Sequence, residues 1–388
     1  MTSLTKKAKK TEGEIKQRSA GSWQIRYTTG YDSKGNQIKK QETLKGSYRE
    51  AQKLLTQRLH ERDTGSLIGK TKLTVEEYME GWLSKYADKH CTIRTAFGYR
   101  GQIKRYINPA IGKITLQKLA TSDIQEMYDD MQSEPRNLSG TTITQLHRVL
   151  KQALNHAVMD GLIQRNPADN IRPPKKNNAT IDMWELETIK EFLAISENYQ
   201  FSDIYKFAVL TGMRRSEICG LKWSMVDLKE GCLRVENTLQ YINGTGLIEG
   251  KPKTDRSRRT INLSADTIRL LEAVWGQRII NKSEYAGLWI EESDYVFSGA
   301  TGEPILPDSL TKEFLRIVRS HNLPNMHFHG LRHAFASLSL SAGVPAKVVS
   351  DHLGHSTINI TLDIYSHVLK PQKSEAPDAV SNLLSGGD

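Results

Sequence analysis

The chain has 388 residues, of which 38% are hydrophobic and 25% are charged. This length exceeds one ordinary hydrophobic core, so we expect two or three domains of about 100–200 residues each. No apolar run approaches the roughly 20 residues that span a bilayer, which excludes a membrane protein. The N-terminus lacks the apolar stretch of a secretory signal, so we expect a cytoplasmic protein.

Positive charge is concentrated near the N-terminus. The formal net charge is +10, and residues 1–70 contain 16 Lys and Arg against 7 Asp and Glu. This excess indicates a polyanionic partner and makes the first 70 residues a candidate nucleic-acid-binding module. Residues 1–20 are polar and aperiodic, which predicts a disordered arm that binds phosphate backbones or, alternatively, only aids solubility.

A small sheet backed by one helix is predicted next in the chain. Two stretches with strand character, 22–28 and 37–44, flank a turn signal. Ser47 and Glu50 then have the spacing of a capping box that opens a helix to about Arg62. Small residues follow, and a domain boundary is expected there, at about residue 69.

Residues 73–168 have the pattern of an all-helical domain. Val75, Tyr78, Met79 and Trp82 recur at helical spacing in its first segment. The expected helices are Thr74–Tyr86, Thr92–Tyr106, Ser122–Gln132 and Thr141–Asp160.

Three groups of basic residues are candidate DNA contacts. One group lies on the predicted sheet and two lie on predicted helices with few acidic neighbours; a face that meets only solvent is the alternative for each. These residues are Arg26, Lys39 and Lys40, expected on one basic face of the sheet, then Arg94, Arg100, Lys104 and Arg105 on one helix, and His147, Arg148 and Lys151 on another.

The C-terminal half is predicted to be mainly helical with one β insert. A polar segment stiffened by Pro-Pro, 169–179, is the expected linker before it. Strand composition at 232–238 and at 259–263 predicts the insert, with a Gly-, Lys- and Pro-rich excursion between the two strands. The chain has no Gly-rich phosphate loop of the nucleotide-binding types.

Seven of the 11 histidines follow residue 320, and a metal site is the first explanation to test. Zinc sites normally combine histidines with Cys or carboxylates, but Arg332 lies within the first histidine cluster, where a cation would have to bind. The cysteines Cys91, Cys219 and Cys232 have no ligand-like spacing and indicate neither zinc nor a disulfide framework. We therefore expect no metal and no other cofactor.

A phosphate site explains the histidines better. His329 and Arg332 are three residues apart, so both side chains can lie on the same side of a helical turn and reach one phosphate. The guanidinium fork matches two phosphate oxygens, and imidazole can donate or accept a hydrogen bond near neutral pH. This spacing alone is weak evidence.

Further segments complete a pattern that resembles the tyrosine recombinase (phage integrase) family. Order and spacing agree with the family over about residues 180–370. The matching segments are Thr211–Glu217 for the first arginine box, Pro252–Thr254 with Ser257–Ile261 for the lysine hairpin, His329–His333 for the second box, Leu353–Ser356 for the third box, and Thr361 with Tyr365–His367 for the nucleophile.

The resemblance implies a role for each matching residue. Tyr365 would attack a DNA phosphorus and form a 3′-phosphotyrosine bond. Donors would meet the charge on the non-bridging oxygens, one group would take the tyrosine proton, and another would protonate the leaving oxygen. The implied catalytic residues are Arg214, Lys253, His329, Arg332, His355 and Tyr365, with Glu217 supporting Arg214, Ser356 capping a helix, and His333, His352 and His367 packing or hydrogen bonding nearby.

The resemblance also implies an architecture: mainly α with small β elements, in several domains. It comprises an arm at 1–20, an arm-type DNA-binding domain with a three-stranded sheet plus helix at 21–69, a core-binding domain at 73–168, a linker at 169–179, a catalytic domain at 180–370 and a tail at 371–388. The implied partners are double-stranded DNA, a homotetramer on that DNA, a host DNA-bending protein and an excisionase, but no membrane. Such a protein would be associated with the nucleoid, and its tail would pack on its own subunit or on a neighbour.

Three other functions remain open from the residues alone. A type IB topoisomerase would use the same chemistry on one duplex, and the basic N-terminal module argues against it. A sequence-specific DNA-binding regulator without cleavage would not need the six matching positions. A zinc-dependent nuclease would be sensitive to a chelator.

Overall fold

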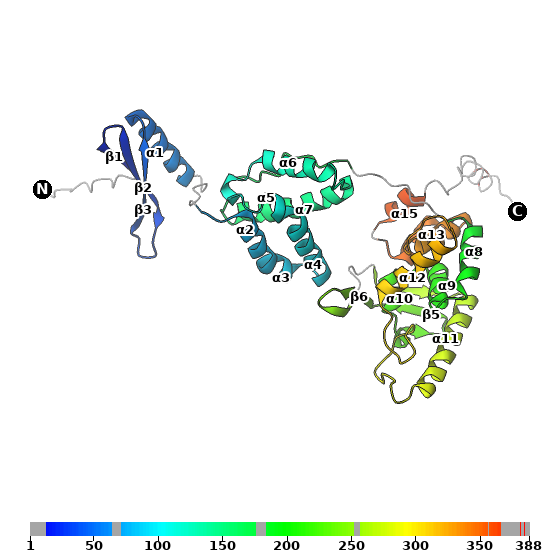
Figure 1. Ribbon diagram of the computed structural model, residues 1–388. Coiled ribbons are helices and arrows are strands. Elements are labelled where there is room, and N and C mark those ends of the chain that lie inside the picture. Colours follow the sequence, from blue (N-terminus) through cyan, green and yellow to red (C-terminus); the bar gives the residue numbers. More distant parts are fainter. Residues whose placement is uncertain are drawn as a thin grey trace. The chain divides into compact units, whose positions relative to one another are not determined.

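The computed structural model describes residues 13–63, 71–175, 184–251, 257–355 and 357–365, together with Ser381 and Leu384. It divides into two compact units, Met1–Asn178 and Ala179–Asp388, and each is described by itself (Figure 1). Among the described residues, no helix is long and apolar enough to cross a membrane.

The first unit begins with an antiparallel sheet. Its strands are β1 (Gly13–Ser19), β2 (Ser22–Tyr31) and β3 (Gln37–Lys45), in the order β1-β2-β3. Helix α1 (Tyr48–Asp63) lies beside this sheet in Figure 1, and its Ala51 shares a buried cluster with Ile25 and Tyr27 of β2. The predicted three-stranded sheet with one helix is confirmed, but its first strand precedes residue 21, where the domain was predicted to begin.

The capping box that opens α1 is also confirmed. The backbone N–H of Ser47 donates to Glu50 Oε2 over 2.7 Å, and the N–H of Glu50 donates to Ser47 Oγ over 3.3 Å. These bonds satisfy two backbone donors that a helix start leaves without partners.

The prediction of a disordered arm is wrong for residues 13–19, which form β1, while residues 1–12 lie outside the described part. In β1, Ile15 pairs opposite Ile25 of β2 and packs against the buried cluster. A single apolar residue among charged and polar ones gives little periodicity, so cross-strand pairing forms a strand that the sequence pattern does not reveal.

The helical domain follows, and each of the four predicted helices is present. Two of them continue through a π-helical turn into a further short helix. The elements are α2 (Val75–Trp82), η1 (Leu83–Ala87), α3 (Asp88–His90), α4 (Ile93–Gln102), η2 (Ile103–Ile107), α5 (Asn108–Ile111), η3 (Leu116–Lys118), α6 (Thr121–Gln132) and α7 (Gly140–Met159).

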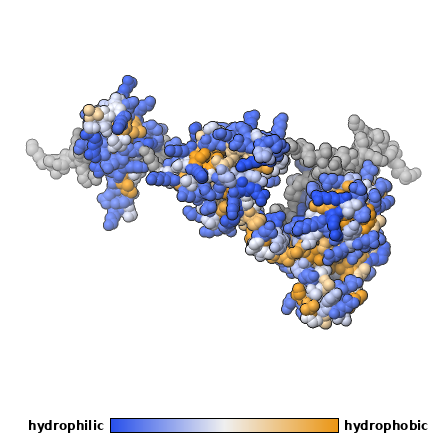
Figure 2. All heavy atoms as spheres, viewed as in Figure 1, coloured by the Kyte–Doolittle hydropathy of each residue, from blue (hydrophilic) through white to orange (hydrophobic). Residues whose placement is uncertain are grey.

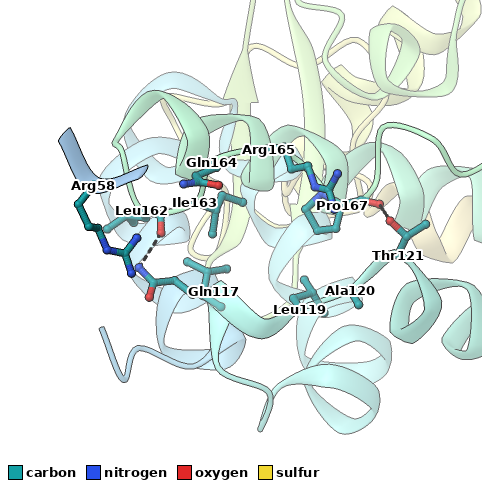
Figure 3. A pocket seen from close by; sticks show the side chains of 11 residues that line it. Arg58, Gln117, Leu119, Ala120, Thr121, Leu162, Ile163, Gln164, Arg165 and Pro167 are labelled. Carbon is teal, nitrogen blue, oxygen red and sulfur yellow. Dashed lines mark hydrogen bonds between the residues drawn. The ribbon is translucent and has the colours of Figure 1, made fainter. Parts of the chain in front are cut away.

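Helix α7 is the central element of this domain. The hydroxyl of Tyr78 on α2 donates to the carbonyl of Ala153 over 2.6 Å, and Trp82 Nε1 donates to His156 Nδ1 over 3.0 Å. A hydrogen bond also holds the segment after α7. At the pocket shown in Figure 3, Gln117 Nε2 donates to the carbonyl of Leu162 over 3.2 Å. None of the predicted site residues lines this pocket.

The second unit contains the remaining elements. Its helices are α8 (Leu186–Ser196), α9 (Ser202–Thr211), α10 (Arg215–Cys219), η4 (Trp223–Met225), α11 (Ala265–Glu284), α12 (Pro307–Ser320), α13 (Gly330–Ser341), α14 (Ala346–Leu353) and α15 (Ile358–Tyr365). Its strands are β4 (Val226–Asp227), β5 (Cys232–Val235), β6 (Thr238–Ile242), β7 (Gly246–Gly250) and β8 (Arg259–Asn262).

The predicted β insert is confirmed and is larger than expected. Strands β5 and β8 pair antiparallel in a sheet of order β4-β5-β8. Thr238 belongs to β6, which pairs with β7 inside the expected excursion. This hairpin leads toward residues 252–256, which lie outside the described part together with the predicted Lys253.

Aromatic side chains fill the core of the second unit. Phe192, Tyr205, Phe314 and Phe328 come from different parts of the chain, and each ring lies within 6.2 Å of at least one other, centroid to centroid. Hydrophilic residues cover most of the visible surface in Figure 2. The core therefore holds α8, α9, α12 and the segment before α13 together, and so fixes the start of α13.

Candidate active site

The first arginine box lies where α9 ends and α10 begins. Gly212 ends α9 in the left-handed conformation (φ 61°) that favours glycine. Arg214 immediately precedes α10, and its Nη1 donates to Glu217 Oε1 over 2.7 Å. The backbone N–H of Arg214 donates to the other oxygen of Glu217 over 2.9 Å. Glu217, whose side chain is 1% exposed, therefore fixes both the backbone and the guanidinium of Arg214.

The neighbouring Arg215 has a different environment. Its Nη1 donates to the carbonyl of Pro307 over 3.1 Å and to the hydroxyl of Thr311, both on α12. Arg215 therefore holds α10 against α12. Of these two neighbouring arginines, Arg214 is the one hydrogen-bonded to Glu217.

The second box forms the start of α13. Arg332 is buried, with 3% of its surface exposed. Its Nη1 donates to the carbonyl of Gly212 over 2.8 Å, and its Nη2 donates to the carbonyl of Leu353 over 2.6 Å. Arg332 thus joins the first box to the third. His329 is the residue before α13, and its ring packs edge-on against that of His333 at 4.9 Å.

The third box follows the end of α14. Gly354 takes the left-handed conformation (φ 67°) at that end, and the N–H of His355 donates back to the carbonyl of Ser350 over 3.0 Å. His355 Nδ1 is hydrogen-bonded to the hydroxyl of Thr361 over 2.8 Å. Because Thr361 is fully buried in α15, both the backbone and the ring of His355 are fixed.

A further histidine holds the boxes together. His352 Nε2 is hydrogen-bonded to the carbonyl of Thr211 over 2.9 Å, and its ring stacks on Phe335 at 4.7 Å. The expected packing and hydrogen-bonding role fits the environments of His333 and His352, whereas His367 and Ser356 lie outside the described part.

Desolvation and cationic surroundings keep two imidazoles neutral. His329 remains partly open to solvent, but desolvation by the groups around its ring, together with the positive charges of Arg332 and Arg214, lowers its pKa to about 4. Burial and the same arginines lower the pKa of His355 to about 4. At neutral pH both rings are therefore uncharged in the absence of an anion.

The structure brings together four of the six predicted catalytic side chains. Arg214 Nη2 donates to the carbonyl of Gly354 over 3.3 Å, which places it beside His355, and Arg332 and His329 lie in the adjacent turn. Lys253 lies outside the described residues, as does the side chain of Tyr365, although the backbone of Tyr365 forms the last residue of α15. The catalytic roles of all six residues stay predictions.

Arg259, which has no role predicted from the sequence, belongs to the same hydrogen-bond network. It lies on β8 and donates from Nη2 to Glu217 Oε2 over 2.9 Å. Strand alternation could have identified it, because Arg259 lies on the same face of β8 as Ile261, which is buried. A charged side chain on the buried face of a strand needs a buried partner of opposite charge.

Among the predicted DNA contacts, the basic face of the sheet needs one correction. Arg26 and Lys39 are exposed, and they lie on the same face of the sheet. Arg26 and Thr28 are two residues apart on β2 and so share a face, and Thr28 pairs opposite Lys39. Lys40 pairs opposite Tyr27, which packs in the cluster under α1. The prediction that all three share one face is therefore wrong for Lys40, since successive residues of a strand point to opposite faces.

The helical faces need a second correction. His147 is 8% exposed and is hydrogen-bonded to the hydroxyl of Tyr128 over 3.1 Å, so it belongs to the core of its domain. Lys151 is partly buried and forms an ion pair with Asp169 at 3.1 Å, and Arg100 forms one with Asp88 at 2.9 Å. The remaining residues of these groups are exposed: Arg94, Lys104, Arg105 and Arg148. Their contact with DNA stays a prediction.

Comparison with known families identifies the chain. Residues 181–372 match the Phage integrase family, and residues 74–132 match the Phage integrase, N-terminal SAM-like domain. The chain belongs to the phage integrase family of tyrosine recombinases. It is therefore an enzyme that cleaves and rejoins DNA at specific sites, and the predicted family, fold class and activity are confirmed.

Relatives match the recombinase over most of its length. A tyrosine recombinase XerC-like protein of Caldanaerobacter subterraneus is 28% identical over 379 residues, covering 93% of this chain and 96% of the relative. The putative prophage phiRv2 integrase of Mycobacterium tuberculosis is 26% identical, covering 99% of this chain and 98% of the relative.

A solved structure supports the fold. A variant of the Tn1549 transposon integrase in complex with transposon right end DNA has a TM-score of 0.67 and 22% sequence identity, covering 80% of this chain and 99% of that chain. Within the described residues of the recombinase, no group of three or more His, Cys, Asp or Glu could hold a metal ion.

Proposed function

We propose that this recombinase exchanges strands between DNA duplexes of a mobile element or prophage through a covalent bond to Tyr365. One observation carries the proposal: Arg214, Arg332 and His355 come from distant parts of the chain and meet at the end of α14. Convergent cationic and neutral donors of this kind suit a DNA phosphate.

The reaction is a phosphoryl transfer in two reversible steps. The phenolic oxygen of Tyr365 forms a bond to phosphorus as the bond from phosphorus to the 5′ oxygen breaks, which leaves a 3′-phosphotyrosine and a free 5′ hydroxyl. The 5′ hydroxyl of another strand then attacks the same phosphorus and releases the tyrosine. Because each step replaces one phosphate ester by another, rejoining needs no nucleotide cofactor.

Arg214, Arg332 and His355 meet the charge that grows on the non-bridging oxygens. Donors fixed in advance are effective because they need no reorganisation as the charge develops. Glu217 fixes Arg214, backbone carbonyls fix Arg332, and Thr361 fixes His355.

Two proton transfers complete the step. His329 takes the proton of Tyr365: its ring is neutral and can accept a proton, and the negative charge of a bound phosphate raises its pKa from about 4 toward that of an effective base. Tyrosine has a reference pKa of about 10, so this assistance is needed. Lys253 gives a proton to the departing 5′ oxygen.

The assembly that performs the exchange is a homotetramer on DNA, because two duplexes and four strands take part. A lambda integrase tetramer bound to a Holliday junction has a TM-score of 0.58 to this chain and 18% identity, covering 96% of this chain and 98% of that chain. In our proposal the N-terminal sheet binds accessory DNA sites, and a host DNA-bending protein and an excisionase assist. The enzyme acts in the cytoplasm at the nucleoid, where its substrate lies.

Covalent adduct formation tests the proposal. The full chain is incubated with a nicked DNA duplex from the ends of the element, with and without a chelator, and resolved on a denaturing gel. We expect a protein–DNA adduct with the wild type and with Tyr285→Phe, a matched control on an exposed tyrosine. Tyr365→Phe should form none.

The outcomes separate the alternatives. Absence of any wild-type adduct contradicts the proposal and favours a regulator without cleavage. An adduct with Tyr365→Phe contradicts the assignment of the nucleophile, and loss of cleavage with the chelator favours a metal-dependent nuclease. Recovery of joined products from two differently marked duplexes supports recombination over the action of a topoisomerase on one duplex.

A further inference from the structure

Arg259 is a buried arginine whose hydrogen bonds join two parts of the active site. Its Nη2 and Nη1 donate to the two oxygens of Glu217 over 2.9 and 3.2 Å, as a bidentate pair. Its Nε donates to the carbonyl of His352 over 2.5 Å. The side chain is only 6% exposed, so it is poorly placed to contact DNA itself.

The end of α14 shows why this position matters. Three consecutive carbonyls, those of His352, Leu353 and Gly354, accept hydrogen bonds from Arg259, Arg332 and Arg214 respectively. The last carbonyls of a helix have no partner within the helix, and they carry the negative end of its dipole. Three guanidinium groups therefore gather at one helix end, directly before His355.

Glu217 is the second shared anchor. Its buried carboxylate lies between Arg214 on one side and Arg259 on the other. Burial raises the pKa of Glu217, but hydrogen bonding to Arg259 and the charges of Arg259 and Arg214 outweigh burial and hold the pKa below its usual value. Glu217 thus stays charged inside the protein and can hold Arg214.

We propose that Arg259 is a positioning residue of the active site: it holds Glu217 beneath Arg214 and fastens the end of α14 that carries His355. The inference rests on the proposed function, since it assumes that Arg214 and His355 bind the reacting phosphate. Arg259 acts through these residues and does not touch the DNA.

The geometry requires arginine at this position. A planar guanidinium can bind both carboxylate oxygens and still direct Nε to a carbonyl on another element. Lysine presents a compact ammonium, which can pair with Glu217 but lacks this fixed fork. Arg259→Lys should therefore keep the charge and lose part of the geometry, whereas Arg259→Gln loses both.

The test measures DNA binding and cleavage separately in the full chain. Affinity for the nicked duplex is measured by fluorescence anisotropy, and the rate of adduct formation is measured at saturating DNA. We expect the affinity of Arg259→Gln to match the wild type and its rate to fall about 100-fold, as when catalytic groups are displaced by about 1 Å. Arg259→Lys should have an intermediate rate. Arg269→Gln, an exposed arginine paired with Asp266, is the matched control and should keep both values.

The pH profile distinguishes positioning from a general loss of structure. In Arg259→Gln, the charged or titratable groups that the described residues still present to Glu217 are Arg214, directly before α10, and His329, directly before α13. The pKa of Glu217 should therefore rise. As the pH is lowered, the rate of adduct formation should therefore begin to fall at a higher pH in Arg259→Gln than in the wild type. In the double variant Arg259→Gln with Glu217→Gln, the rate should not show this additional decrease at acid pH.

Several results would overturn the inference. A wild-type rate in Arg259→Gln would show that the active site does not depend on this residue. A rate loss of equal size at every pH, shared with Arg259→Lys, would show a structural defect without the proposed link to Glu217. If the wild type forms no adduct at all, the proposed function itself fails; wild-type adduct formation with an unaffected Arg259→Gln rejects only this inference.

Discussion

Neutral histidines among arginines are the defining feature of this site at the scale of single residues. The rings of His329 and His355 are neutral because desolvation and the nearby guanidinium groups of Arg214 and Arg332 disfavour a further positive charge. An incoming phosphate would add negative charge and relax this penalty. The site is therefore arranged to be completed by an anion.

This arrangement predicts that stability depends on pH. In the unfolded chain a histidine has a pKa of about 6.5, whereas the folded value for His329 and His355 is about 4. Between these values the unfolded chain binds protons that the folded chain does not, so stability is lost as pH falls from about 6.5 to about 4. Urea unfolding at pH 7 and pH 5 should give a lower free energy of unfolding at pH 5.

Replacing the two imidazoles should weaken that dependence. We expect the difference between pH 7 and pH 5 to shrink in His329→Asn and His355→Asn, because asparagine does not titrate. His327→Asn, which changes an exposed histidine two residues away, is the control. An unchanged difference in both active-site variants would show that other groups cause the pH dependence.

Two glycines at helix ends organise the site at the scale of elements. Gly212 ends α9 and Gly354 ends α14, both in the left-handed conformation. Each turn directs the chain into a catalytic box, toward Arg214 in one case and His355 in the other. Gly212 has a second constraint, because its carbonyl accepts from Arg332 and its surroundings are tightly packed.

Gly212→Ala should therefore be more damaging than an ordinary glycine substitution. A Cβ at this position would lie 2.6 Å from Phe335 Cδ1 and 2.8 Å from Leu353 Cδ2. Left-handed backbone costs alanine about 1–2 kcal/mol, and overpacking typically costs about 1–3 kcal/mol in addition. Gly343→Ala is the matched control, since Gly343 has φ 85° and no heavy atom within 4 Å of a built Cβ. Equal unfolding free energies in the two variants would contradict the packing argument.

Much of this architecture follows from local signals in the sequence. Capping residues and helical periodicity predicted α1 and α7, because a cap and an apolar stripe each satisfy a local physical requirement. The strand β1 escaped prediction, because Ile15 gains its partner only by pairing with β2. The Arg259 pair with Glu217 escaped for the same reason, since the two residues are 42 positions apart. Contacts of this kind depend on the tertiary fold.

At the scale of the whole molecule, the recombinase consists of parts with separate cores. The sheet module has the cluster of Ile25, Tyr27 and Ala51, while the helical domain and the second unit each have a larger one. Separate cores allow the N-terminal sheet to carry its own DNA-binding surface without altering the active site. Its contribution to DNA binding can therefore be tested by substitutions confined to that sheet.

The two faces of the sheet make that test specific. Each phosphate contact by Lys or Arg contributes about 0.9 to the slope of log affinity against log salt for duplex DNA. If the open face binds DNA, Arg26→Gln and Lys39→Gln should each lower this slope by up to about that amount. Lys40→Gln should leave it unchanged, because Lys40 lies on the face that packs under α1. Titration of long duplexes carrying the ends of the element, at several salt concentrations, measures the slope. Adduct formation on a short nicked duplex should stay at the wild-type rate in all three variants. Equal effects of Lys39→Gln and Lys40→Gln would instead indicate general attraction by charge, without a defined binding face.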